Sequence, residues 1–254
     1  MYRVINIKQL TLNLCMVKFT QKELDEINPT LKTAQDALKW ASDNLHPKVA
    51  KASSFGAEDS LLIDMMTKIN PNFRFFTLDT GRLPEETYTI MDKLSKKYKV
   101  TFEVMFPEAE DVKAMVESKG INLFYDSVEN RHLCCGIRKV KPLRKMLSGM
   151  DGWITGIRKD QTSTRENAKM LEIDEKYDGI VKVNPLLDWS WDQVWKYIKD
   201  NNVPYHSLID KGYSSIGCEP CTRAIKEGED LRAGRWWWET NETKECGLHA
   251  PEVL

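Results

Sequence analysis

The clearest periodicity in the chain is a helical one near its start. Between residues 29 and 45, apolar side chains recur at alternating spacings of three and four, which predicts a helix with one buried face: Leu31, Ala34, Leu38, Ala41 and Leu45. A helix with a single apolar face needs another layer to cover it. The pattern therefore predicts a packed domain in which this helix lies on a sheet.

Short apolar or β-branched runs predict five strands, at residues 49–53, 73–78, 100–106, 153–157 and 180–183. Helical patterns separate most of them, at residues 59–69, 84–98, 108–119 and 139–147. Strands that alternate with helices predict an α/β fold with a mainly parallel sheet and helices on both faces. Ligands of such sheets bind at the carboxyl ends of the strands.

The pattern changes after residue 187. DWSWDQVWKYIKDNNV predicts an amphipathic helix capped by Asp188 or Ser190, and Pro204 and a Cys-bearing loop follow it. From Gly228 onward the chain is polar apart from three tryptophans, which predicts a mobile C-terminal segment. We therefore divide the chain into an N-terminal lead-in (1–23), an α/β domain (24–227) and a C-terminal segment (228–254).

Composition excludes several classes of protein. The 254 residues carry 37 Lys and Arg against 38 Asp and Glu, a balance that argues against a dedicated nucleic-acid binder or a polybasic membrane anchor. No apolar run reaches the roughly 18 to 20 residues of a membrane helix, and the N-terminus lacks a secretory signal. We expect a cytoplasmic protein, whose six cysteines are reduced thiols available for metal binding or catalysis.

Four cysteines form the strongest local feature: Cys134 and Cys135 are adjacent, and Cys218 and Cys221 form a Cys-x-x-Cys turn. Four thiolates around one centre predict either zinc or an iron-sulfur cluster. Adjacent residues rarely turn both side chains toward one small ion, whereas a [4Fe-4S] cluster offers separate irons, so the spacing favours the cluster. The alternative is a pair of buried cysteines and an unrelated turn.

Two loops follow predicted strands and lead into helices. The first, SSFGAEDS, offers hydroxyls, a glycine and helix N-terminal amides to a phosphate or sulfate, although an ordinary helix cap explains it equally well. Its spacing is not that of a P-loop. A second, similar turn could line the same nucleotide site. The candidate residues are Ser53, Ser54, Gly56 and Asp59 in the first loop, and Leu78, Asp79, Thr80 and Gly81 in the second.

Basic residues gather in places that suit a polyanionic ligand, although each one could equally lie on a solvated helix face. They include Lys139, Arg158, Arg165, Arg232 and Arg235. Near the C-terminus, Cys246 lies between Lys244 and His249. Positive neighbours favour a thiolate, so Cys246 is a candidate nucleophile, and a tail thiol without a role is the alternative.

In this order, the motifs closely resemble those of assimilatory adenylyl-sulfate (APS) reductases, the iron-sulfur branch of the APS/PAPS reductase family. They are SSFGAED, LDTGRL, CCGIRKVKPL, TGIRKDQTSTR, IGCEPCTR, RAGRWWWE and KECGLH, and they run from about residue 24 to residue 249. The resemblance implies a PP-loop (adenine nucleotide alpha-hydrolase-like) fold for the nucleotide-binding domain.

The resemblance also implies roles for the candidate residues. Cys134, Cys135, Cys218 and Cys221 would ligate a [4Fe-4S] cluster, and Lys139 would lie between cluster and substrate. The loops and basic residues above, with His249 of the last motif, would bind the substrate. Cys246 would be the nucleophile, carried on the C-terminal segment.

The implied reaction is the thiol-dependent reduction of adenosine 5′-phosphosulfate to sulfite and AMP in sulfate assimilation. Cys246 would attack the sulfur, leaving an S-sulfocysteine that an external dithiol then cleaves. Because the chain ends at Leu254 without the thioredoxin-like domain of plant relatives, we expect a separate thioredoxin-type donor. The near-neutral net charge of this chain neither promotes nor forbids a homo-oligomer.

Three alternatives stay open at this point. A reductase for PAPS, or for both nucleotides, shares the nucleotide motifs, but PAPS-specific relatives lack the four cluster cysteines. A non-catalytic, zinc-stabilised nucleotide-binding module would make Cys246 dispensable. A PP-loop ATP pyrophosphatase is disfavoured because the loop lacks a doubled glycine.

Overall fold

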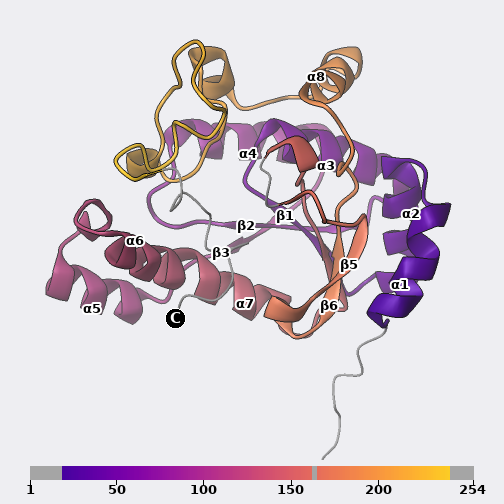
Figure 1. Cartoon of the computed structure of the whole chain (residues 1–254), viewed down its shortest axis with the longest axis horizontal. Coiled ribbons are helices and arrows are strands. Elements are labelled where there is room, and N and C mark those ends of the chain that lie inside the picture. Colours follow the sequence, from indigo (N-terminus) through magenta and orange to yellow (C-terminus); the bar gives the residue numbers. More distant parts are fainter. Residues whose placement is uncertain (1–18, 162–164, 241–254) are drawn as a thin grey trace, which may run out of the picture.

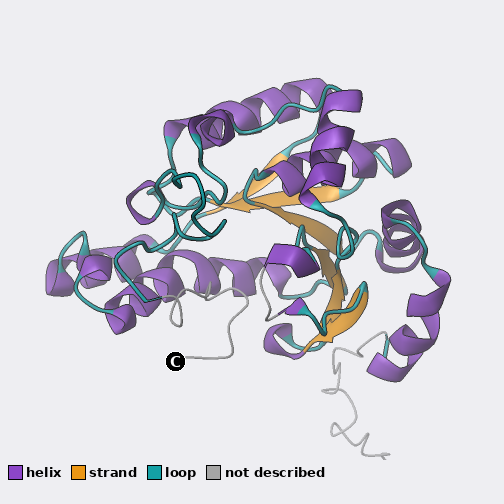
Figure 2. Cartoon of the chain, turned by 45° about the horizontal axis from the view of Figure 1, so that its top comes forward, coloured by secondary structure: helices purple, strands orange, loops and turns teal. Residues whose placement is uncertain are grey.

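A six-stranded sheet forms the centre of the protein, and its strand order is β3-β2-β1-β4-β6-β5 (Figures 1 and 2). This computed structural model describes residues 19–161 and 165–240. The strands are β1 (Val49–Ser53), β2 (Arg74–Leu78), β3 (Phe102–Met105), β4 (Gly152–Ile154), β5 (Leu171–Asp174) and β6 (Ile180–Val183).

The sheet is mainly parallel, as predicted. β1 pairs with β2 and β4, β2 with β3, and β4 with β6, all in parallel, whereas β5 runs antiparallel to β6 at one edge. The predicted α/β fold is therefore confirmed, with one strand, β5, that the sequence pattern did not predict. The chain reverses its direction along the sheet between β1 and β4, the place where α/β sheets bind ligands.

Helices cover both faces of the sheet, and Figure 1 shows α3 and α4 on one side and α5, α6 and α7 on the other. The α-helices are α1 (Gln21–Ile27), α2 (Ala34–Leu45), α3 (Ala57–Ile69), α4 (Glu85–Tyr98), α5 (Ala109–Lys119), α6 (Val128–Cys135), α7 (Lys141–Leu147) and α8 (Trp191–Asp200). The predicted helices all occur, and α1 and α6 are additional. Ser190 caps α8 in a capping box with Gln193, as one of the two predicted caps.

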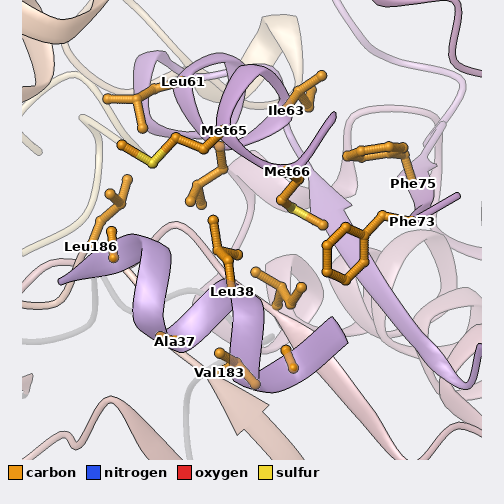
Figure 3. Close-up of a cluster of buried hydrophobic side chains, with 14 of the residues drawn as sticks. Ala37, Leu38, Leu61, Ile63, Met65, Met66, Phe73, Phe75, Val183 and Leu186 are labelled. Carbon is orange, nitrogen blue, oxygen red and sulfur yellow. The ribbon is translucent and has the colours of Figure 1, made fainter. Parts of the chain in front are cut away.

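The larger core lies under α2, α3, α4 and α8. Figure 3 shows Leu38 of α2 facing Met65 and Met66 of α3. On the other face, Leu143 of α7 packs in a smaller cluster with Ala50 of β1. Because side chains alternate along a strand, β1 contributes to both cores and is buried on both faces.

The described part of the C-terminal segment is packed against the domain. Arg223 donates its backbone N–H to Gly234, and Trp236 is 1% exposed. The sequence predicted mobility for the whole segment from Gly228 onward, of which residues 241–254 lie outside the described residues. At the other end, α1 starts at Gln21, before the boundary predicted at residue 24.

Among the helices that the structure describes, none combines the length and apolar character that crossing a membrane requires.

Candidate functional site

A cavity of about 280 Å³ opens at the carboxyl ends of β1, β2 and β4, where the strand order reverses. Its size is near the lower end of small-molecule sites. The residues that line it include the predicted Ser53, Ser54, Gly56, Asp59, Leu78, Lys139, Arg158, Arg165, Arg232 and Arg235. The structure thus brings residues from six of the seven motifs to one place, because Ile216 and Gly217 also line the cavity.

The loop between β1 and α3 owes its shape to internal hydrogen bonds. The carboxylate of Asp59 accepts from the backbone N–H of Ser54 at 2.6 Å and from its hydroxyl at 2.9 Å. Phe55 has a φ of 62°, a conformation that non-glycine residues rarely adopt, and its N–H donates to Ser53 Oγ at 3.2 Å. Gly56 precedes α3 without a side-chain cap, which leaves the first amides of the helix to a ligand.

Residues of the second predicted turn contact two different regions, the cavity and the cysteines. Leu78 lines the cavity, but Asp79, Thr80 and Gly81 are not among its lining residues. Thr80 Oγ1 instead lies 3.2 Å from Cys218 Sγ, and its carbonyl accepts from Arg138 at 2.6 Å. The turn that the sequence assigns to the nucleotide therefore contacts the cysteine region.

Asp79 holds this turn together. Its carboxylate accepts from the Gly81 N–H at 2.8 Å, where glycine has a positive φ of 69°, and from the Tyr88 hydroxyl at 3.0 Å. Burial, and then the hydrogen bond to Asp79, raise the pKa of Tyr88 to about 12. Asp79 thus stabilises the backbone between β2 and α4.

The predicted basic residues differ in their surroundings. Arg158 is 1% exposed, donates to Glu58 at 2.9 Å and pairs with Asp160, so carboxylates of the protein already hold its guanidinium. Arg165 donates to Gln161. Arg235 is 6% exposed and donates to Ser215 Oγ at 3.4 Å, while its Nε has no hydrogen-bond partner among the described residues.

The four cluster-candidate cysteines come from two segments. Cys134 and Cys135 end α6, which continues as a π-helical turn, Gly136–Val140, that carries Lys139. Cys218 and Cys221 flank a 3₁₀ turn. Cys134, Cys218 and Cys221 lie in one apolar cluster with Met115, Leu123, Phe124 and Trp236, and none of the four forms a disulfide.

Positive charges favour the thiolate of Cys218 but not those of its neighbours. Burial raises the pKa of Cys218, but Lys139, the Thr80 hydroxyl, Arg235 and Arg138 together outweigh it, so the pKa of Cys218 is lowered. Burial raises the pKa of Cys134, and burial together with Cys218 raises the pKa of Cys221 to about 12. Cys218 thus lies close enough to Cys134 and Cys221 to affect their ionisation.

The donor set is compatible with an iron-sulfur cluster, which thiolates ligate. Cys134, Cys218 and Cys221 lie in one apolar cluster, and Cys135 is adjacent to Cys134 in the sequence. Within residues 19–161 and 165–240, no three His, Cys, Asp or Glu side chains form a group that could hold a metal ion.

Comparison with known proteins identifies the family. Residues 48–224 match the phosphoadenosine phosphosulfate reductase domain. The match covers more than half of the chain. The chain belongs to this family. A curated adenosine 5′-phosphosulfate reductase from Neisseria meningitidis serogroup B is 49% identical over 205 residues, which cover 80% of this chain and 83% of the relative.

Solved structures agree with this family. A phosphoadenylyl-sulfate (PAPS) reductase from Candida auris, in complex with phosphate, matches with a TM-score of 0.70 and 29% identity over 82% of this chain and 98% of that one. An FMN adenylyltransferase from Candida glabrata matches with a TM-score of 0.52 and 14% identity over 84% of this chain and 75% of that one, which shows the fold alone. The PP-loop-like fold predicted from the sequence is therefore confirmed for this chain.

Two candidate residues lie outside the described part of the chain, and some residues at the cavity were not predicted. Cys246 and His249 belong to residues 241–254, which the structure does not describe. Residues 214–217 also line the cavity, and the only sequence signal for them was the IGCEPCTR motif, which begins at Ile216. Lys51, buried beneath the first loop, gave no sequence signal except a charge within an apolar strand.

Proposed function

We propose that the protein reduces adenosine 5′-phosphosulfate to sulfite and AMP, using an external dithiol such as thioredoxin. One observation carries the proposal: Lys139 and Arg235 line the cavity and also act on Cys218, so the nucleotide cavity and the cysteine region share their cations. The relative from Neisseria meningitidis bears the name of this activity. None of the four described cysteines forms a disulfide, in keeping with the reducing, cytoplasmic location that we propose.

The nucleotide would occupy the cavity with its phosphate at the Ser53–Gly56 loop. The amides that begin α3 and the two serine hydroxyls offer hydrogen bonds to phosphate oxygens. Lys139, Arg165, Arg232 and Arg235 would face the phosphosulfate, because they line the same cavity. Arg158 would act indirectly, since its guanidinium already binds Glu58 and Asp160.

In the proposed reaction the Cys246 thiolate attacks the sulfur of the phosphosulfate. A sulfur–sulfur bond forms, the bond between sulfur and the bridging oxygen breaks, and AMP leaves with that electron pair. Lys139 and the arginines would stabilise the charge that develops on the leaving phosphate. One thiolate of the donor then attacks Cys246, sulfite leaves with the electron pair, and the second donor thiol regenerates Cys246 by disulfide exchange.

We infer that Cys134, Cys135, Cys218 and Cys221 hold a [4Fe-4S] cluster. The donor dithiol already supplies both electrons, so the cluster, when bound, supplies negative charge beside Lys139 and a link between the two cysteine segments. Lys139 would thereby be held between the cysteine region and the cavity. The same four cysteines favour APS over PAPS as substrate, because they characterise the APS branch that the sequence resembles.

The test measures sulfite release from APS by protein purified without oxygen, with and without a dithiol donor. We expect sulfite only when donor is present, about four iron atoms and four labile sulfides per chain, and a preference for APS over PAPS at limiting enzyme. Turnover without any reductant would contradict the thiol step. About one zinc per chain without labile sulfide would favour a nucleotide-binding module.

Cys246→Ser provides the matched control, since it changes one atom of the proposed nucleophile. We expect it to abolish sulfite formation and the S-sulfo adduct on the protein, while AMP still binds. Sulfite formation at the wild-type rate in this variant would remove Cys246 from the mechanism.

A further inference from the structure

A buried lysine lies beneath the Ser53–Gly56 loop, and the reaction proposed above does not use it. Lys51 occupies the middle of β1, and its side chain is 0% exposed. Because side chains alternate along a strand, it points to the same face as Val49, which belongs to the core under α3. An ammonium group in such a place is strongly unfavourable without a partner, so its partner indicates its role.

That partner is Asp59, in the first turn of α3. Lys51 Nζ donates to Asp59 Oδ1 and to the main-chain carbonyl of Ala52. The other carboxylate oxygen, Oδ2, accepts the backbone N–H of Ser54 at 2.6 Å and the Ser54 hydroxyl at 2.9 Å. Asp59 therefore joins the lysine below the loop to the serine within it.

Asp59 creates an electrostatic problem for an anion site. Both Asp59 and Ser54 line the cavity, so a phosphate held by the loop would lie close to a carboxylate. Glu58, the neighbouring acidic residue, also lines the cavity and is bound by the buried Arg158 at 2.9 Å. Each carboxylate in the first turn of α3 thus has a buried cation of its own.

We propose that Lys51 is a positioning residue that neutralises Asp59. With its charge balanced, the carboxylate can hold Ser54 in the loop without repelling the phosphate that the loop binds. This inference rests on the proposed function, because it needs a nucleotide 5′-phosphate in the cavity. It adds to the SSFGAED motif a residue two positions before it, on the strand rather than in the loop.

The test compares the binding of AMP with that of adenosine to the full-length protein, because adenosine lacks only the phosphate. For Lys51→Met we expect AMP to bind at least about tenfold more weakly, with adenosine within about twofold of wild type. The double variant Lys51→Met/Asp59→Asn removes both charges, and we expect its AMP affinity to return to within about threefold of wild type. A structural role of Lys51 would weaken both ligands alike.

Two further variants complete the design. Lys68→Met is the matched control, because Lys68 also pairs with a carboxylate of α3, Asp64, at 2.6 Å, but neither residue lines the cavity. We expect its ratio of AMP to adenosine affinity to be unchanged. Asp59→Asn alone shifts that ratio toward AMP and supplies the answer if Lys51→Met does not fold.

The outcomes separate this inference from the proposed function. Equal losses for AMP and adenosine in Lys51→Met, or no recovery in the double variant, would overturn the role of Lys51 alone. If the wild-type protein bound adenosine and AMP equally, or neither, the proposed function would fail and the inference with it.

Discussion

The buried ion pair between Arg131 and Glu239 connects the cysteine-bearing helix to the end of the described chain. Arg131 lies on α6 three residues before Cys134, and it donates to the two oxygens of Glu239 at 2.7 and 2.9 Å. The two side chains are 0% and 3% exposed. The Arg131 guanidinium also lies 4.5 Å from the ring centroid of Trp236, which packs beside Cys221. Removing the charge of Glu239 therefore takes away the carboxylate that accepts two hydrogen bonds from this buried cation.

We predict a large loss of stability for Glu239→Gln, which keeps the shape of the side chain. Removing one partner from a buried pair costs about 3 to 5 kcal/mol in the free energy of unfolding. In a chain of this size each kcal/mol shifts the midpoint by about 2 to 4 °C, so we expect thermal unfolding about 6 to 20 °C lower. Thermal and urea denaturation followed by circular dichroism measure both quantities.

The chain offers a control with the same geometry and a different environment. Arg223 donates to the two oxygens of Glu229 at 2.8 and 3.0 Å, but these side chains are 33% and 30% exposed. Water screens such a pair, so Glu229→Gln should unfold close to wild type. Equal shifts in the two variants, or a Glu239→Gln protein as stable as wild type, would refute the argument that burial decides the effect.

The buried His206 should make stability depend on pH, because one ring nitrogen accepts a backbone N–H at 3.3 Å and the other contacts the Thr87 hydroxyl at 3.0 Å. Burial lowers the pKa of His206, so the contribution of His206 to stability is complete above about pH 6.5 and is lost as the pH falls below that value. Urea midpoints measured at several pH values should therefore fall as the pH is lowered. A His206→Gln variant should show a weaker dependence of the midpoint on pH. Lys139→Ala should slow sulfite formation by about 10²- to 10³-fold with an unchanged unfolding midpoint, and a near-normal rate would remove Lys139 from the mechanism. In Gly217→Ala, the added Cβ would clash with Arg235 Nη2, so the guanidinium must move. Titration should then show that AMP binds about tenfold more weakly. Unchanged binding would mean that Arg235 does not contact the phosphate.

Periodicity predicted the elements whose burial follows a simple pattern. The alternating spacing of Leu31 to Leu45 and the apolar runs of β1 and β2 reflect faces that pack on the main core. β5 escaped prediction because it is a short edge strand, LEID, with only Leu171 buried. α6 escaped because the buried side chain of its middle is Arg131, whose partner lies 108 residues away.

The motifs identified most residues that line the cavity, but they did not show which of these side chains bind other protein groups. Arg158 follows a strand and is of a residue type that commonly binds anions. Its guanidinium nevertheless donates to the carboxylate of Glu58, which lies 100 residues earlier in the chain. Asp59 was expected to face the substrate, and its carboxylate is engaged by Lys51 and Ser54. Such assignments depend on which side chains the fold brings together, and no local pattern contains that information.

The turn after β2 shows why the cavity and the cysteine region belong to one site. Leu78, the last residue of β2, lines the cavity, whereas Thr80 in the turn contacts Cys218 and accepts from Arg138. Arg82 then accepts, through its carbonyl, the backbone N–H of Glu219 at 2.8 Å. One short turn thus contacts the nucleotide cavity and both cysteine-bearing segments. Because a shift of either cysteine segment would move this turn, we predict that loss of the proposed cluster weakens nucleotide binding, even though no cysteine lines the described cavity.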